Sequence, residues 1–155
     1  MDAQRVGWVV DRIGWLAMLV VILAAIGGLF GNGLFGARTT STSDRGMRVT
    51  YDRFGRYGAD SKLLFQMSRE ALDAGEWRLS IERAYLESMA IDDIVPEPDS
   101  VEARPGALVY IFVADEPSDL LVTFDMTGNS VGPVHGAAHL DVSGEPASFD
   151  QFFFP

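Results

Sequence analysis

Residues 107–114 read ALVYIFVA, a run of eight apolar residues. A run this short that is apolar on both faces is expected of a central strand in a sheet. The segment Glu116-Pro-Ser-Asp119 has the composition of a turn, and it leads into a second apolar segment, Leu120–Phe124. These residues predict a central strand of a β domain at 107–114, which a turn connects to a further strand at Leu120–Phe124.

Apolar and polar residues alternate in several other segments, which is the period expected of half-buried strands. The clearest case is Trp77, Leu79 and Ile81, which alternate with Arg78, Ser80 and Glu82. Further strands are predicted at 47–51, 63–67, 131–140 and 149–154. Short strands separated by Gly and Pro turns predict an antiparallel, immunoglobulin-like β-sandwich of about seven strands over residues 47–155.

Two segments of this domain have a helix as an alternative interpretation, and a third is excluded as a central strand. Ser68–Gly75, with Ser68 as a cap, and Arg83–Met89 are each interpreted as a strand or loop with a short helix as the alternative. Val95-Pro-Glu-Pro98 cannot be a central strand, because proline has no backbone N–H for the ladder.

Ahead of this domain, Ile13–Ala37 contains no charged side chain. At about 1.5 Å of helical rise per residue, its first 18 residues would cover roughly 27 Å, close to the hydrocarbon thickness of a bilayer. We therefore expect a single transmembrane α-helix with a glycine-rich end over residues 13–37. A cleavable signal peptide is the alternative, but its apolar region would be only about 7–15 residues long, and bulky Phe35 lies where cleavage favours a small residue.

Small residues recur along one face of the expected span, at steps of three and four. Small residues let membrane helices approach closely, so this face is predicted to pack on another transmembrane helix. The residues of this small-residue stripe are Gly14, Ala17, Val21, Ala24, Gly28 and Gly31.

The complete organisation is then a short N-terminal tail at 1–12, the span at 13–37, a polar tether at 38–46 and the sandwich at 47–155. Counting arginines beside the span favours a cytoplasmic domain, but long translocated domains largely escape that rule. The short tail and the β-rich domain favour a signal anchor in the cell inner membrane of a bacterium, with the C-terminal domain in the periplasm.

Charge is divided unevenly along the chain. Residues 38–62 carry six cations against three acids, whereas residues 63–155 carry four cations against seventeen acids. An acidic surface repels phosphate backbones, so a nucleic-acid partner is not expected. The chain has no cysteine, which excludes disulfides and thiolate metal sites.

Two segments combine the residue types that are enriched at protein interfaces, aromatics and arginine. Both are predicted to dock on a partner, although core packing is the ordinary role of the phenylalanines. The predicted docking residues are Arg48, Tyr51, Arg53, Phe54, Arg56, Tyr57, Phe152 and Phe154.

The same two segments carry a resemblance to a known group of proteins. The run Val49-Thr-Tyr-Asp-Arg-Phe-Gly-Arg-Tyr57, the expected single span and the ending Ser148-Phe-Asp-Gln-Phe-Phe-Phe-Pro155 resemble small single-span bacterial proteins that accompany polytopic membrane proteins of the YetF type. The resemblance implies a companion subunit, and it brings no catalytic residues.

Candidate chemistry is sparse. His135 and His139 could face the same way, with Asp141 as a third ligand for zinc, but no H-E-x-x-H arrangement is present and exposed histidines are the better interpretation. The acidic residues Asp92-Asp93 and Asp115, Glu116 and Asp119 lack the spacing of a calcium loop.

We therefore predict a non-enzymatic, membrane-anchored accessory subunit without a cofactor. Its partner would be a polytopic membrane protein or a second copy of the chain, beside the lipid bilayer. The alternatives are a ligand- or lipid-binding sensory module and, less favoured, a metal-dependent hydrolase.

Overall fold

This computed structural model describes residues 3–26, 37–41, 46–114, 116, 118–142 and 145–155. The chain divides into two units at Gly36. The first contains helix α1 (Ala3–Ile26), and the second, residues 37–155, contains the strands.

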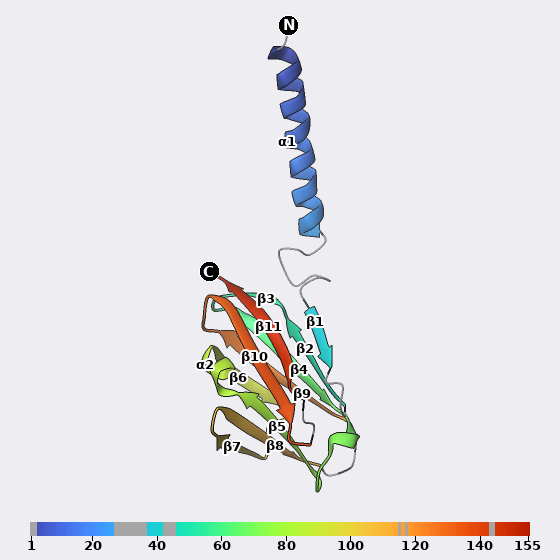
Figure 1. The fold of residues 1–155 in the computed structure, drawn as a ribbon, viewed down its shortest axis with the longest axis vertical. Coiled ribbons are helices and arrows are strands. Elements are labelled where there is room, and N and C mark those ends of the chain that lie inside the picture. The colour runs from blue at the N-terminus through green and yellow to red at the C-terminus, as the bar shows by residue number, and fades with distance from the viewer. Residues whose placement is uncertain (1–2, 27–36, 42–45, 115, 117, 143–144) are drawn as a thin grey trace. The chain divides into compact units, whose positions relative to one another are not determined.

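The first sheet of the second unit has five antiparallel strands in the order β1-β2-β4-β9-β6. Figure 1 labels these strands. Their bounds are β1 (Ala37–Ser41), β2 (Met47–Asp52), β4 (Asp60–Met67), β9 (Leu120–Gly128) and β6 (Met89–Val95).

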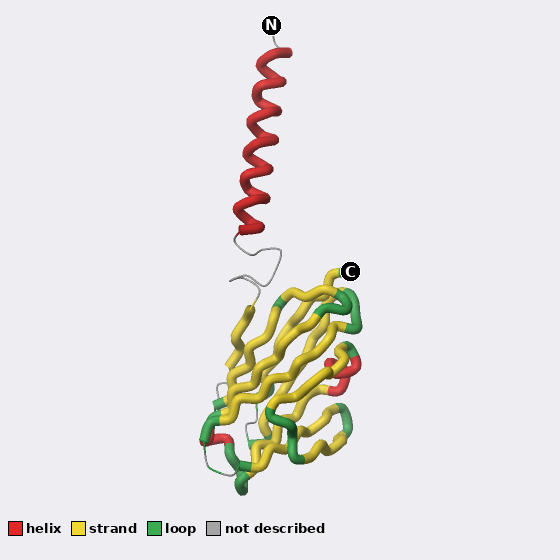
Figure 2. The backbone as a smooth tube through the Cα atoms, turned by 180° about the vertical axis from the view of Figure 1, so that it is seen from behind, coloured by secondary structure: helices red, strands yellow, loops and turns green. Residues whose placement is uncertain are grey.

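The second sheet has six strands in the order β3-β11-β10-β5-β8-β7, and all its pairs are antiparallel except β3 with β11. The strands are β3 (Phe54–Arg56), β11 (Ala147–Phe154), β10 (Gly132–Leu140), β5 (Glu76–Glu82), β8 (Ala107–Val113) and β7 (Ser100–Arg104). Figure 2 shows the two layers of strands from behind.

The core lies between the two sheets. Along β2, β4, β9 and β11 every second side chain is buried, which is the alternation expected when one face of a sheet packs inward. Aromatic rings from the two sheets meet in this layer: Tyr110 lies 5.1 Å from Phe124 and Tyr51 lies 5.6 Å from Phe149, between ring centroids. The second unit is therefore a β-sandwich.

Two short helical segments connect strands of the sandwich. A 3-10 turn (Arg69–Ala71) follows Ser68, whose hydroxyl accepts a hydrogen bond from the N–H of Glu70. Helix α2 (Arg83–Glu87) follows β5 and buries Tyr85 and Leu86. The helical alternative is thus confirmed for both segments.

Tyr85 is the centre of a buried polar network. Its hydroxyl donates a hydrogen bond of 2.7 Å to Oε1 of Gln151, and Nε2 of Gln151 donates to the carbonyl of Asp52 at 2.8 Å. Burial raises the pKa of Tyr85 well above its ordinary value, so the hydroxyl stays protonated and keeps its role as donor. The network ties α2, β11 and β2 together across the sandwich.

The expectation of a transmembrane helix is wrong. Among the described residues, no helix combines the length and the apolar character that crossing a bilayer requires. The reason lies in the helix bounds: α1 begins ten residues before Ile13, includes Arg5, Asp11 and Arg12, and ends at Ile26. The longest run of α1 without a charged side chain is Ile13–Ile26, 14 residues or about 21 Å of helix, whereas a span needs about 20 residues.

The expected number of about seven strands is also wrong, because the described residues contain five strands in one sheet and six in the other. Four strands were not predicted: β1, β3, β6 and β7. β1 covers part of the segment 38–46 for which a polar tether was expected, and residues 42–45 lie outside the description. β3, β6 and β7 are mostly exposed, so their residues have no apolar alternation to reveal them.

We expect Tyr85→Phe to lower the free energy of unfolding by about 1–3 kcal/mol, because Oε1 of Gln151 is left buried without its donor. Urea denaturation followed by near-UV circular dichroism measures this loss. Tyr57→Phe is the matched control, since Tyr57 is exposed and its change should stay within about 0.5 kcal/mol. Equal losses in the two variants would contradict the structural role of the network.

Candidate functional site

The chain passes from one sheet to the other at Arg53, between β2 and β3. β3 then pairs in parallel with β11, so that Phe54 lies opposite Phe152 and Arg56 lies opposite Phe154. The backbone N–H of Phe152 donates to the carbonyl of Arg53 at 2.9 Å, and the N–H of Tyr57 donates to the carbonyl of Phe154 at 2.7 Å. These bonds hold two segments together that are about a hundred residues apart in sequence.

Phe153 determines which side chains of this pair face outward. It is buried, and a Cβ added at Gly55 or at Gly128 would lie 2.6 Å from its ring. The ring therefore lies directly against the backbone of β3 at Gly55 and of β9 at Gly128, in space that only glycine leaves open. Since side chains alternate along a strand, Phe152 and Phe154 point to the opposite, outer face.

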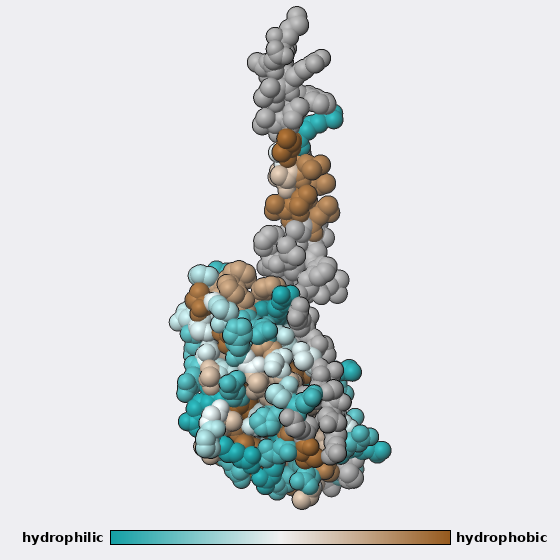
Figure 3. Space-filling view, viewed as in Figure 1, coloured by the Kyte–Doolittle hydropathy of each residue, from teal (hydrophilic) through white to brown (hydrophobic). Residues whose placement is uncertain are grey.

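On this outer face three phenylalanine side chains are exposed together: Phe54 by 39%, Phe152 by 37% and Phe154 by 48%. Tyr57, which is 57% exposed, follows directly after β3. The ring centroids of Phe152 and Phe154 are 5.0 Å apart, and those of Phe54 and Phe154 are 6.1 Å apart. Figure 3 shows apolar surface at the end of the sandwich where β11 ends.

Two arginines border these rings. The guanidinium carbon of Arg53 lies 5.3 Å from the ring centroid of Phe54, within the range of a cation–π contact. Arg56 is exposed beside it on β3. We refer to Arg53, Phe54, Arg56, Tyr57, Phe152 and Phe154 as the aromatic–arginine patch.

Six of the eight residues predicted for docking therefore lie in one patch, and two do not. Tyr51 is only 3% exposed and packs against Phe149 in the core, because it lies on the inward face of β2. Arg48 is exposed, but it lies opposite Gln66 in the other sheet. Both belong to β2 and not to β3, a boundary that the sequence pattern does not reveal.

The structure also adds neighbours that the sequence did not indicate. Pro133 of β10 lies opposite Phe152, and Val131, which is exposed, comes just before the same strand. Pro133 reaches the patch through strand pairing, and its own sequence carries no sign of this.

The candidate zinc ligands do not form one site. His135 lies opposite Asp150, with 2.6 Å between Nδ1 and Oδ1, whereas His139 lies opposite Ser80. Four residues of strand separate the two histidines by about 13 Å. Asp141 is paired with Arg104 at 3.0 Å. Within the described part of the chain, no three His, Asp or Glu side chains are arranged to hold a metal ion.

The small-residue stripe is described only in part. Gly14, Ala17 and Val21 lie on α1, Ala24 lies in α1 with its side chain outside the description, and Gly28 and Gly31 are outside the described residues. The predicted packing of this stripe on another helix stays a prediction.

No protein-family model matches the chain, and no curated protein matches it. Among solved structures, the chain is similar to the cohesin module of a family 33 glycoside hydrolase from Clostridium perfringens. The sequences are 11% identical, the TM-score is 0.47, and the match covers 70% of this chain and 96% of the module. A likeness at this level does not bear on the site, and the resemblance to companions of YetF-type proteins stays a prediction.

We expect Gly55→Ala to loosen the pairing of β3 with β11, because the new methyl group would collide with the ring of Phe153. Hydrogen exchange at the amides of Tyr57 and Phe152 measures the pairing directly, and it should become about tenfold faster or more. Ser148→Ala, on the exposed face of β11, is the control and should leave both amides protected. Unchanged protection in Gly55→Ala would show that the ring does not hold β3 in place.

Proposed function

We propose that this protein is a non-enzymatic recognition module that docks on a partner protein through the aromatic–arginine patch. The observation that carries the proposal is the joint exposure of three phenylalanine rings, Tyr57 and two arginines at one edge of the sheet. These residue types dominate the binding energy of protein interfaces.

The patch is already ordered before any partner arrives. Its phenylalanines lie on hydrogen-bonded strands, and the ring of Phe153 beneath them is fixed against two glycines. Side chains that are held in place lose less conformational entropy on binding than side chains on a flexible loop. Exposing several large rings together has an unfavourable hydration free energy, which contact with a partner would relieve.

The charge of the patch favours an acidic partner surface. Arg53 and Arg56 belong to the basic segment 38–62, whereas residues 63–155 carry seventeen acids against four cations. No ion pair with Arg53 or Arg56 is present among the described residues, so both guanidinium groups are available to carboxylates of a partner. A surface with apolar side chains surrounded by Asp and Glu would complement the patch in both respects.

The nature of the partner stays a prediction from the sequence, which favours a membrane protein. The location of the domain outside the cytoplasm is likewise a prediction. Docking through the patch requires neither a membrane partner nor a location outside the cytoplasm, because all six residues of the patch lie in the sandwich.

Photo-crosslinking tests the proposal at the level of single residues. A photoreactive phenylalanine analogue is introduced at Tyr57 or at Phe154 of the whole chain, and the cells that produce it are irradiated. We expect one discrete crosslinked product that is common to both positions, and mass spectrometry then identifies its second polypeptide. The product should decrease at least tenfold when Arg53→Glu and Arg56→Glu are added, because the charge complementarity is reversed.

Leu121 is the matched control position, since it is equally exposed and lies on β9 of the other sheet. The analogue at Leu121 should give no such product. The same product from Leu121, or no protein product from either patch position, would overturn the proposal. Products that contain only lipid would instead assign the patch to a membrane surface.

A further inference from the structure

β7 is an edge strand of the six-stranded sheet, and among the described strands none pairs with its outer side. The other edges differ from it: β3 has three residues, β6 has a register irregularity between Ile91 and Asp93, and β1 is bounded by residues outside the description. Such short or irregular edges resist pairing with another chain. β7 is regular over five residues, and its first four are exposed.

The hydrogen-bonding groups of β7 follow from its turn. Arg104 and Ala107 close the two-residue turn Pro105-Gly106, so Arg104, and with it Glu102, directs its N–H and C=O toward β8. Alternate residues of a strand point their backbone groups in opposite directions. Val101 and Ala103 therefore present theirs at the open edge.

The side chains of β7 carry charges in an order that complements itself. If two copies of β7 lie antiparallel with Ala103 opposite Ala103, then Glu102 of each copy lies opposite Arg104 of the other. Ala103 then exchanges two hydrogen bonds with Ala103 of the other copy, and the N–H of Val101 faces the carbonyl of Pro105 of the other copy, which has no N–H to donate in return. A register centred on Glu102 would place two glutamates opposite each other, which is unfavourable.

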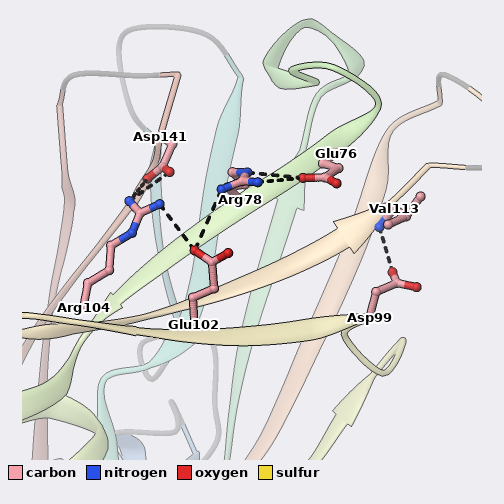
Figure 4. Close-up of polar contacts among 7 residues, drawn as sticks. All are labelled: Glu76, Arg78, Asp99, Glu102, Arg104, Val113 and Asp141. Atoms are coloured by element: carbon pink, nitrogen blue, oxygen red, sulfur yellow. Dashed lines mark hydrogen bonds and ion pairs between the residues drawn. The ribbon is translucent and has the colours of Figure 1, made fainter.

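Glu102 and Arg104 form ion pairs with residues of β5 and of the turn after β10. Arg104 lies 3.0 Å from Asp141 and 3.7 Å from Glu102, and Glu102 lies 3.9 Å from Arg78. Figure 4 shows these side chains side by side across the sheet. Beneath them the apolar side chains of Val109 and Ile111 are buried, although they lie on the outer face of β8.

We propose that β7 is an interface for a second copy of this chain: two β7 strands pair antiparallel about Ala103 and join the six-stranded sheets of two sandwiches into one continuous sheet. Two Glu102–Arg104 pairs across the interface extend the ion-pair row that each copy already has. Val101, which is half exposed in one copy, then lies opposite Pro105 of the second copy. This interface is separate from the aromatic–arginine patch, which lies at the opposite edge of the same sheet.

Sedimentation equilibrium of the whole chain tests the interface over a concentration series into the submillimolar range. We expect the wild-type chain to shift from one to two copies. Glu102→Arg should abolish this shift, because it places arginines opposite each other, and Arg104→Glu should abolish it by placing glutamates opposite each other. An equimolar mixture of the two variants should dimerise again, since each arginine then faces a glutamate.

Glu87→Arg is the control, because it makes the same change of charge on the exposed side of α2. It should dimerise like the wild type. Thermal unfolding of each variant separates loss of dimer from loss of fold. A wild-type chain that stays single over the series, variants that dimerise unchanged, or a mixture that stays single would each overturn the proposal.

A cysteine placed at the centre of the interface tests the register independently. The chain contains no cysteine, so Ala103→Cys introduces a single thiol in each copy. Residues that exchange hydrogen bonds across antiparallel strands have Cα atoms about 5.5 Å apart, which suits a disulfide. Under mild oxidation we expect a covalent dimer from Ala103→Cys and none from Ser100→Cys; the reverse result would refute the register centred on Ala103.

Discussion

The ring of Phe153, packed against the backbone at Gly55 and Gly128, is the contact on which the candidate site depends. It joins β3 and β11 of one sheet to the end of β9 in the other sheet. Because Phe153 points inward, the phenylalanines on either side of it must point outward. One buried ring thereby explains both the closure of the sandwich at this edge and the exposure of the aromatic side chains.

The two edges of the six-stranded sheet have different chemistry. At the β3 edge, aromatic rings are exposed beside two arginines that form no ion pair with any described residue. At the β7 edge, arginines and carboxylates alternate and are already paired with one another. The β3 edge suits an acidic partner surface. The β7 edge suits a second copy of β7, because in an antiparallel pair Glu102 of each copy faces Arg104 of the other. One sheet can therefore serve two interfaces without competition.

Much of the sandwich was predictable from residue alternation. The segments at 47–51, 63–67, 77–81, 107–114 and 131–140 contain strands, because their apolar side chains face one shared core. Segment 107–114 was predicted to be a central strand. In the structure β8 is the second strand from the edge of its sheet, with only β7 beyond it. Its outer residues Val109 and Ile111 are nevertheless buried. The transmembrane span was predicted from the length of an uncharged run, which does not reveal that α1 ends at Ile26, before the run does.

By itself, the sequence determined that the C-terminal residues form a β domain and that aromatics and arginines gather in two segments. It also determined the charge of each part of the chain. Only the tertiary structure decided that Phe54 meets Phe152 and Phe154 while Tyr51 is buried, and that Glu102 and Arg104 lie on an open edge. The physical reason is that alternation assigns side chains to one of two faces, whereas strand pairing, which joins residues about a hundred positions apart, decides which faces become a surface.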